Sequence, residues 1–335
     1  MAKKAAKPKS VAAAACTPTL LREFTPALKH DVNSVAFFPS GQLLASGSQD
    51  GDVRIWITET GTSAKTNPQK IDRWAVMEVA CSDDGSTVAI VRTSQKGKRA
   101  LGWDGLDIGL KQGTDRGHLW NYATSMNRRI DPHSKTHGVL KSLSFVGFDK
   151  LVAVTLGAIR MFNLASGEPT GESMPHKKCN IAAVSRDGKT IVSGDDDGQI
   201  FVWTALTGSK RRRIKSHTAA VSRLEFSEDG KQFASAGADQ TMRIWDVGTG
   251  KMRRTWSGSW KSTLALKFLP GDNGLMAVND YDGEGKVQLG VFAAERSLSE
   301  YPIAEDVRCA DIARDGTSIA TGHFSGKIRL WGFTS

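Results

Sequence analysis

The stretch SAGADQTMRIWD (residues 235–246) places an acid, Asp239, six residues before an indole, Trp245, with a basic and β-prone run between them. Related stretches follow the same plan: SGSQDGDVRIW ends at Trp56, SGDDDGQIFVW at Trp203 and TGHFSGKIRLW at Trp331. An arrangement that recurs several times indicates a repeat architecture, because a catalytic constellation appears once in a chain.

Three weaker units complete the series. GTDRGHLW ends at Trp120, TLGAIRMF ends at Phe162, and GEGKVQLG puts Gly290 at the equivalent place. The steps between successive positions are 64, 42, 41, 42, 45 and 41 residues. A period of about 40–45 residues is typical of a four-stranded propeller blade, so the series predicts seven blades.

Each unit also contains an earlier hairpin signal. VSRLEFSEDGKQFASAG (221–237) alternates apolar and polar residues, breaks at Asp-Gly and alternates again, and 32–48, 181–195 and 307–323 follow the same pattern. Alternation around a D-G or S-G turn predicts strand, hairpin turn and strand. A third strand then ends near the tryptophan, and a fourth follows a turn such as VGTGK or ALTGS.

With these features, residues 18–335 resemble the WD-repeat β-propeller family: three units closely, one well and three weakly. The resemblance implies an all-β ring of four-stranded antiparallel blades. It also implies a hydrogen-bonded tetrad of His, Ser or Thr, Asp and Trp within a blade. The matching residues are His30, Ser46, Asp50 and Trp56; His176, Ser193, Asp197 and Trp203; and His217, Ser235, Asp239 and Trp245.

The last unit departs from this pattern and from the blade length. It keeps Thr321 and Trp331 but has Ser325 where the resemblance predicts Asp. Only four residues follow Trp331, too few for a fourth strand. The strand-like segment TLLREFTPAL (19–28) is therefore predicted to supply the outer strand and to close the ring, which hides an open sheet edge.

The composition fits one large globular domain. The chain has 335 residues, of which 39% are hydrophobic and 24% charged, and 34 glycines favour a turn-rich all-β fold. No apolar run is long enough for a membrane span. The cysteines form no C-x-x-C pair, which indicates reduced thiols in a cytoplasmic protein rather than disulfides or a zinc site. These cysteines are Cys16, Cys81, Cys179 and Cys309.

Half of the net charge of +10 lies at one end of the chain, where residues 1–30 hold six basic residues and one acidic residue. We interpret residues 1–17, which contain AKKAAKPKS, as a flexible basic leader. One alternative is contact with nucleic acid or an anionic surface. Another is a secretory leader that ends at a lipid-modified Cys16, although VAAAAC is shorter than a signal-peptide core.

The long step between Trp56 and Trp120 contains an insertion, TSQKGKRALGWDGLDIGLKQG (93–113), between the second and third strands of blade 2. It holds Lys96, Lys98, Arg99 and Lys111 around a lone Trp103. The resemblance places this turn on the face that bears the entrance to the central channel. A long loop on a rigid scaffold is a common binding element, and the alternative is a hairpin extension anchored on a neighbouring blade by Trp103.

Basic residues are concentrated on two predicted outermost strands. KRRRIKSH (210–217) and KMRRTW (251–256) occupy corresponding positions in successive blades. Charged outer strands protect sheet edges from pairing with other chains. The alternative is contact with an acidic partner or a phosphate backbone, although no aromatic platform is interleaved for stacking on single-stranded bases.

The resemblance implies that partners contact residues beside the start of each first strand and just before the turn acid. The set mixes both charge signs with Met and Phe, a composition typical of a protein-binding surface. Its members are Asp31, Asn33, Gln49, Met77, Trp103, Lys178, Asn180, Asp196, Ser222, Asp306, Arg308 and Phe324, with Lys141 and Leu264 at further equivalent positions.

No sequence motif for catalysis is present: there is no phosphate loop, dinucleotide fingerprint, H-E-x-x-H or G-x-S-x-G. The acid-rich stretches 193–199 and 280–285 do not match the calcium loop. We therefore expect a non-enzymatic protein-interaction scaffold without cofactor or metal, monomeric on its own, that binds a protein or peptide. The alternatives are a nucleic-acid-associated propeller that uses the basic leader and outer strands, and a propeller hydrolase.

Overall fold

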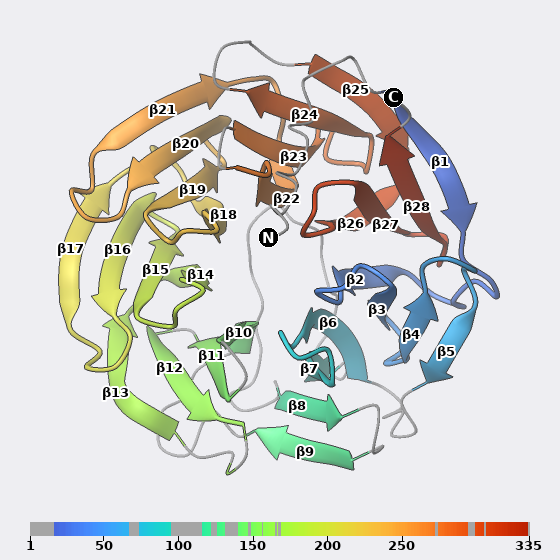
Figure 1. The fold of residues 1–335 in the computed structure, drawn as a ribbon, viewed down its shortest axis with the longest axis horizontal. Coiled ribbons are helices and arrows are strands. Elements are labelled where there is room, and N and C mark those ends of the chain that lie inside the picture. The colour runs from blue at the N-terminus through green and yellow to red at the C-terminus, as the bar shows by residue number, and fades with distance from the viewer. Residues whose placement is uncertain are drawn as a thin grey trace, which may run out of the picture.

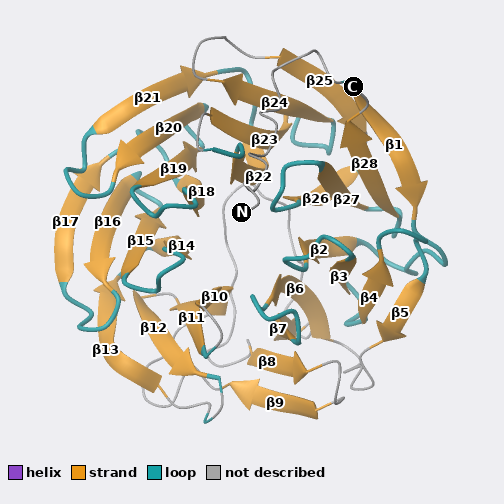
Figure 2. Cartoon of the chain, viewed as in Figure 1, coloured by secondary structure: helices purple, strands orange, loops and turns teal. Residues whose placement is uncertain are grey.

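The structure, a computed structural model, is a ring of small sheets around a central cavity (Figure 1). The residues that it describes are 17–66, 74–94, 116–121, 126–130, 140–146, 149–155, 157–164, 166, 169–271, 274–293, 299–304 and 306–333. The described residues form strands joined by loops (Figure 2), and the strands make up seven four-stranded antiparallel sheets, which we call blades 1 to 7. Residues 1–16 and 95–115, which include Trp103, lie outside the described residues.

The first three blades follow one another along the chain. Blade 1 contains β2 (Val32–Phe37), β3 (Leu43–Ser48), β4 (Val53–Ile57) and β5 (Ser63–Thr66). Blade 2 contains β6 (Trp74–Cys81), β7 (Thr87–Ser94), β8 (Arg116–Asn121) and β9 (Met126–Ile130). Blade 3 contains β10 (Leu140–Val146), β11 (Lys150–Thr155), β12 (Gly157–Asn163) and β13 (Pro169–His176).

Blades 4 to 6 repeat this order, from the innermost to the outermost strand. Blade 4 contains β14 (Cys179–Val184), β15 (Thr190–Asp195), β16 (Gln199–Thr204) and β17 (Lys210–Lys215). Blade 5 contains β18 (Val221–Phe226), β19 (Gln232–Gly237), β20 (Thr241–Asp246) and β21 (Met252–Ser257). Blade 6 contains β22 (Ser262–Phe268), β23 (Gly274–Asp280), β24 (Val287–Ala293) and β25 (Ser299–Ala304).

Blade 7 combines two distant parts of the chain. It contains β26 (Val307–Ile312), β27 (Ser318–His323), β28 (Ile328–Phe333) and β1 (Pro18–Glu23). β1 pairs with β28 from Pro18 opposite Phe333 to Glu23 opposite Arg329. The Glu23 carboxylate accepts a hydrogen bond from Arg329 at 3.0 Å, and this contact lowers its pKa. The predicted closure by an N-terminal strand is confirmed, and residues 24–28 belong to the loop before β2.

Apolar side chains fill the interfaces between blades. The buried apolar residues that the structure describes form seven clusters, each shared by two neighbouring blades. Between blades 4 and 5, for example, Val192 and Val202 share a cluster with Phe233 and Trp245. Because burial of apolar area is the main favourable term in folding, each blade is stable only with its neighbours in place.

A glycine in the second strand allows the close approach of the next blade. A Cβ atom on Gly194 of β15 would lie 2.5 Å from Cγ1 of Val221, the first residue of β18. Gly47 faces Val76, and Gly322 faces Val32, in the same way. The S-G and T-G pairs that the sequence repeats are therefore interface residues, because only a residue without Cβ leaves room for the valine.

One repeat position differs from the sequence prediction. Trp56, Trp203, Trp245 and Trp331 each pair with an apolar residue of the preceding strand, such as Leu44 opposite Trp56. In blade 6 the equivalent residue of β24 is Phe292, opposite Leu275, so the assignment of Gly290 to this place is wrong. Trp260, which is fully buried, contacts Phe292 edge-on at 6.0 Å. An aromatic cluster thus replaces the polar tetrad in blade 6.

The substitution Gly194→Ala tests this packing. The new methyl group has to displace Val221, so we expect a loss of about 1–3 kcal/mol in the free energy of unfolding, as for other overpacked interfaces. Gly248→Ala is the matched control, because its Cβ atom meets no atom closer than 3.5 Å. Urea denaturation of both variants checks the prediction, which equal losses of stability would contradict.

Candidate functional site

The innermost strands carry bulges at one mouth of the central cavity. In β2 the pairing register shifts between Val32 and Ser34, so Asn33 has no partner in β3. A bulge adds one unpaired residue and changes the direction of its side chain. The same shift occurs near the start of β6, β10, β14, β18, β22 and β26. The bulge residues, which we call the bulge ring, are Asn33, Met77, Lys141, Asn180, Ser222, Leu264 and Arg308.

All seven residues of the bulge ring line the central cavity, whose volume is about 1480 Å³. The structure therefore brings together residues that the sequence places far apart. Six more residues lie beside these strand starts or begin the turns between second and third strands: Asp31, Gln49, Lys178, Asp196, Asp306 and Phe324. We call the bulge ring together with these six residues the entrance face.

Hydrogen bonds connect the entrance face across blade boundaries. The Asn33 side-chain amide donates to Oε1 of Gln49 at 2.8 Å and to the carbonyl oxygen of Val76, in blade 2, at 2.8 Å. Lys141 of blade 3 donates to Oδ1 of Asn180 in blade 4. These contacts hold the polar side chains in defined positions before any partner arrives.

Arg308 is oriented by two contacts. Its guanidinium group forms an ion pair with Asp31 of blade 1, with 3.2 Å between Nη1 and Oδ2. The carbon Cζ of Arg308 also lies 5.1 Å from the centre of the Phe324 ring, within the range of a cation–π interaction. Asp306 has a left-handed backbone, with φ of 63°, and its carboxylate accepts the backbone N–H of Ser325 at 3.2 Å. This turn presents Phe324 next to the arginine.

Exposure separates the apolar members of the entrance face. Met77 and Phe324 are 40% and 39% exposed, whereas Leu264 is buried. The Ser222 hydroxyl donates to a backbone carbonyl of β19 at 3.1 Å. Met77 and Phe324 are therefore the apolar side chains of this face that are open to a partner.

A chain of hydrogen bonds in blade 5 joins the four residues of a tetrad. The indole N–H of Trp245 donates to the Ser235 hydroxyl at 2.9 Å. That oxygen lies 2.8 Å from Nε2 of His217, whose Nδ1 lies 2.9 Å from the Asp239 carboxylate. The Ser235 hydroxyl accepts a hydrogen bond from the indole and can donate one to a neutral imidazole. The imidazole in turn donates a hydrogen bond to the carboxylate. Asp239 also accepts the backbone N–H of Thr241 and so holds the turn before β20.

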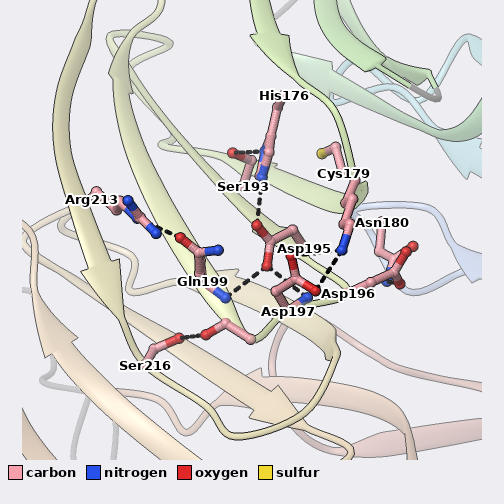
Figure 3. Close-up of polar contacts among 12 residues, drawn as sticks. His176, Cys179, Asn180, Ser193, Asp195, Asp196, Asp197, Gln199, Arg213 and Ser216 are labelled. Atoms are coloured by element: carbon pink, nitrogen blue, oxygen red, sulfur yellow. Dashed lines mark hydrogen bonds and ion pairs between the residues drawn. The ribbon is translucent and has the colours of Figure 1, made fainter.

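Blade 4 forms the same chain with a different carboxylate (Figure 3). Trp203 donates to Ser193 at 2.8 Å. In Figure 3, His176 lies 2.9 Å from Ser193 through Nδ1. Nε2 of His176 lies 3.2 Å from Asp195, not Asp197. The assignment of Asp197 to the tetrad is therefore wrong.

Strand geometry explains this correction. Ser193 and Asp195 are two residues apart on β15, so their side chains point to the same face of the sheet. Asp195 also accepts the backbone N–H groups of Asp197 and Gln199 at 3.0 and 2.8 Å. The side chain of Asp197 is exposed and forms an ion pair with Lys178 at 2.8 Å. The tetrad therefore holds the turn that presents Asp196 on the entrance face, with Asp197 next to it in the same turn.

Blade 1 keeps only part of the predicted network. Trp56 donates to Ser46 at 2.8 Å, but His30 is exposed, and Asp50 accepts a hydrogen bond from Ser48. The inclusion of His30 and Asp50 is therefore wrong. Phe24 explains the difference, because it is buried edge-on against Trp56 with 5.7 Å between ring centres. An aromatic contact thus supports this indole.

Blade 7 contains a histidine that the sequence analysis missed. Trp331 donates to the Thr321 hydroxyl at 2.9 Å, and Nε2 of His323 lies 2.9 Å from the same oxygen. His323 is buried, and it follows Thr321 by two residues on β27, as Asp195 follows Ser193 on β15. The two-residue spacing after the hydroxyl is the sequence signal that identifies it.

Charged groups in the cavity wall also connect blades, and the sequence analysis did not select them. Glu78, next to the bulge in β6, accepts hydrogen bonds from the Ser142 hydroxyl at 3.0 Å and the Leu143 N–H at 3.2 Å in blade 3. Burial raises the pKa of Glu78 to about 7. In the same wall, Lys267 of blade 6 forms an ion pair with Glu225 of blade 5 at 2.8 Å. Strand alternation is the sequence signal that could have identified these residues. Glu78 follows its bulge residue by one position, and Glu225 and Lys267 follow theirs by three, so all three face the cavity.

Other kinds of site can be checked against the described residues. Among them, no group of three or more His, Cys, Asp or Glu side chains could hold a metal ion. That part of the chain also has no helix able to cross a membrane. Cys81, Cys179 and Cys309 are free, and burial raises the pKa of Cys179 and Cys309 to about 12. Their thiols therefore stay protonated and are poor nucleophiles at neutral pH.

Alanine at the two aspartates separates their roles. Asp195→Ala leaves buried donors without an acceptor, so we expect a loss of about 3 kcal/mol in the free energy of unfolding. Asp197→Ala removes only an exposed ion pair and should leave stability nearly unchanged. Urea denaturation of the two variants measures the difference, and similar losses would return Asp197 to the tetrad.

The buried histidines predict a pH dependence. Burial lowers the pKa of His176 and His217 below 6.5, although the partner aspartates oppose this shift. As pH falls below about 6.5, the unfolded chain takes up these protons before the folded protein does, so the free energy of unfolding should decrease. His217→Gln should weaken the dependence, whereas His30→Gln, at an exposed site, is the control. Denaturation curves from pH 8 to 5 test this, and equal slopes for both variants would count against it.

Comparison with known proteins identifies the repeat. The model of the WD40 family (WD domain, G-beta repeat) matches residues 19–56, 167–204, 208–246 and 296–332. Autophagy-related protein 16 of Arabidopsis thaliana is 24% identical over 194 residues, which cover 58% of this chain and 34% of that protein. The chromatin assembly factor 1 subunit FAS2 homolog of Oryza sativa subsp. japonica is 25% identical over 189 residues, covering 56% of this chain and 27% of that protein.

These curated relatives are much longer than the matched segment, which spans about a third of their length or less. A solved chain from the crystal structure of the mitotic checkpoint complex superposes with a TM-score of 0.76 at 17% identity, covering 100% of this chain and 97% of that chain. With WD40 repeats in four segments and a propeller fold throughout its described residues, the chain belongs to the WD-repeat β-propeller family.

Proposed function

We propose that this propeller is a non-enzymatic scaffold that binds a protein or peptide partner on its entrance face. The observation that supports this most directly is the bulge ring, in which seven blades each contribute one side chain to the same mouth of the cavity. A surface built from seven separate segments on rigid strands can contact a partner over the 20–30 residues that a stable interface uses.

The chemistry of the entrance face suits a protein partner. Arg308 is already oriented by Asp31 and Phe324, so little side-chain freedom is lost when a partner binds. Arginine and aromatic residues are frequent at the energetic centres of interfaces, and exposed methionine adapts to varied apolar surfaces. Met77 supplies that adaptable contact at another point of the ring.

Two further parts of the proposal concern catalysis and the ring itself. The charged groups of the cavity wall hold blades together, as Lys267 and Glu225 do, and this structural role supports a non-enzymatic function.

We also infer that the seven described sheets are the full set of blades. Seven interface clusters and the pairing of β1 with β28 support this count.

The relatives fit a scaffold role at the level of their names. One is named as a subunit of chromatin assembly factor 1, and the solved chain comes from the mitotic checkpoint complex, so both belong to protein assemblies. For this chain the partner is a proposal that rests on the entrance face. The nucleic-acid alternative involves a different surface, the outer strands β17 and β21.

The double substitution Met77→Glu with Phe324→Glu tests the entrance face. Charged groups at the two exposed apolar sites should reduce capture of partner proteins at least about tenfold, a loss of about 1.4 kcal/mol or more in binding. Leu206→Glu is the matched control, because Leu206 is 76% exposed in the β16–β17 turn at the outer rim.

The measurement is affinity capture of each tagged variant from nuclease-treated extract, with quantitative mass spectrometry and a thermal unfolding curve. Partners that bind the wild type and Leu206→Glu equally, but not the folded double variant, support the proposal. Unchanged capture by the double variant would exclude the entrance face. Partners that disappear from the wild type after nuclease treatment would instead depend on nucleic acid.

A further inference from the structure

The rim of blades 4 and 5 carries a concentrated positive charge. β17 and β21 are the outermost strands of these neighbouring blades, as the sequence predicts, and lie next to each other along the rim (Figure 1). Neither strand contains an acidic residue. We call their basic residues, with Lys251, the basic rim: Lys210, Arg211, Arg212, Arg213, Lys215, Lys251, Arg253 and Arg254.

Most of this charge has no acidic partner in the described residues. Arg253 alone of the eight forms a described ion pair, with Asp246. Neutral groups hold others in place: Arg212 donates to the carbonyl oxygen of Gly248 at 2.9 Å, and Nζ of Lys210 lies 5.1 Å from the centre of the Phe201 ring. Seven of the eight residues are exposed, all except Arg212. The rim therefore presents positioned cations whose charge is not neutralised.

Protection of sheet edges does not account for so many charges. One lysine or a few charged residues suffice to block pairing between edges. Among the other outermost strands, β1 and β5 contain one basic residue each, β13 and β25 contain none and β9 contains two. β17 alone contains five. The excess on one side of the ring points to a binding role.

We propose that the basic rim binds the phosphate backbone of double-stranded DNA without reading its sequence. Arg213 and Lys215 are exposed and two residues apart on β17, so their side chains project from the same face, about 6.7 Å apart. Arg211, exposed at a bulge of the same strand, adds a third cation beside them. Guanidinium groups match the oxygen atoms of phosphate in a two-pronged geometry. A row of such cations follows a backbone that carries one charge at each nucleotide.

The other side chains of the rim favour duplex DNA over RNA or single strands. Trp256, the aromatic residue of β21, is half-buried and contacts Phe292 edge-on at 5.7 Å, so its face is not free to stack on bases. The basic side chains of β17 are donors only, so they offer no acceptor for the proton of the 2′-hydroxyl that distinguishes RNA. Backbone contact with DNA needs neither feature.

The salt dependence of binding tests this proposal. The full chain is titrated with a fluorescent DNA duplex of arbitrary sequence by anisotropy at several salt concentrations. Each lost phosphate contact reduces the slope of log K against log salt by about 0.9, so Arg211→Gln with Arg213→Gln and Lys215→Gln should make it shallower by about 2.7. The matched control is Arg186→Gln with Lys189→Gln and Lys231→Gln, exposed residues on the β14–β15 and β18–β19 turns.

A shallower slope for the rim variant, with the control close to wild type, supports the proposal. An equal change in both variants would show that only net charge matters and overturns it, as does an unchanged slope for the rim variant. Duplex RNA and polyglutamate serve as competing ligands. Tighter binding to either one than to the DNA duplex at the same salt also overturns the assignment. Because the entrance face is intact in both variants, failure here leaves the scaffold function untouched.

Discussion

The hydrogen bond from an indole N–H to a buried hydroxyl is the contact on which four of the described blades are organised. It joins the third strand to the second in blades 1, 4, 5 and 7, always across ten residues of chain and at 2.8–2.9 Å. A buried polar group without a hydrogen-bond partner is costly. Inside an apolar interface, this bond gives the indole N–H an acceptor and the hydroxyl oxygen a donor. The other groups that support the indole and the hydroxyl differ from blade to blade.

This division explains what the sequence could predict. The repeat period, the hairpins and the Trp–Ser pairs depend on residues close together in the chain, and they could be read directly. The choice of carboxylate could not, because Asp195, Asp196 and Asp197 are consecutive and only the end of β15 decides which one faces His176. Spacing from the tryptophan favoured Asp197, and strand alternation overrules it. In blade 1 the deciding residue, Phe24, belongs to a loop outside the repeat pattern.

The sequence could predict which residues belong to the entrance face, but not how their side chains are oriented or which of them touch. The strand starts follow from the repeat, so the residues beside them could be named in advance. The bulge that turns them toward the cavity is a property of backbone pairing, and so is the contact of Arg308 with Asp31 across the boundary of blades 7 and 1. Tetrad and face are also mechanically linked, because Asp195 holds the turn that carries Asp196. A substitution in the buried tetrad therefore changes the position of entrance-face residues that it does not itself replace.

The composition of blade 7 has a consequence for biosynthesis. β1 is among the earliest described segments to leave the ribosome, yet its partner β28 is more than 300 residues away, as the 313-residue separation of Thr19 and Gly332 shows. During translation the early strand has no sheet to join, and its exposed Leu20 and Leu21 are available to other chains. Contacts between such distant residues form slowly, and unpaired edges aggregate. The ring is therefore most vulnerable while it is being made, and the growing chain gains from any factor that shields its first strand until the last one emerges.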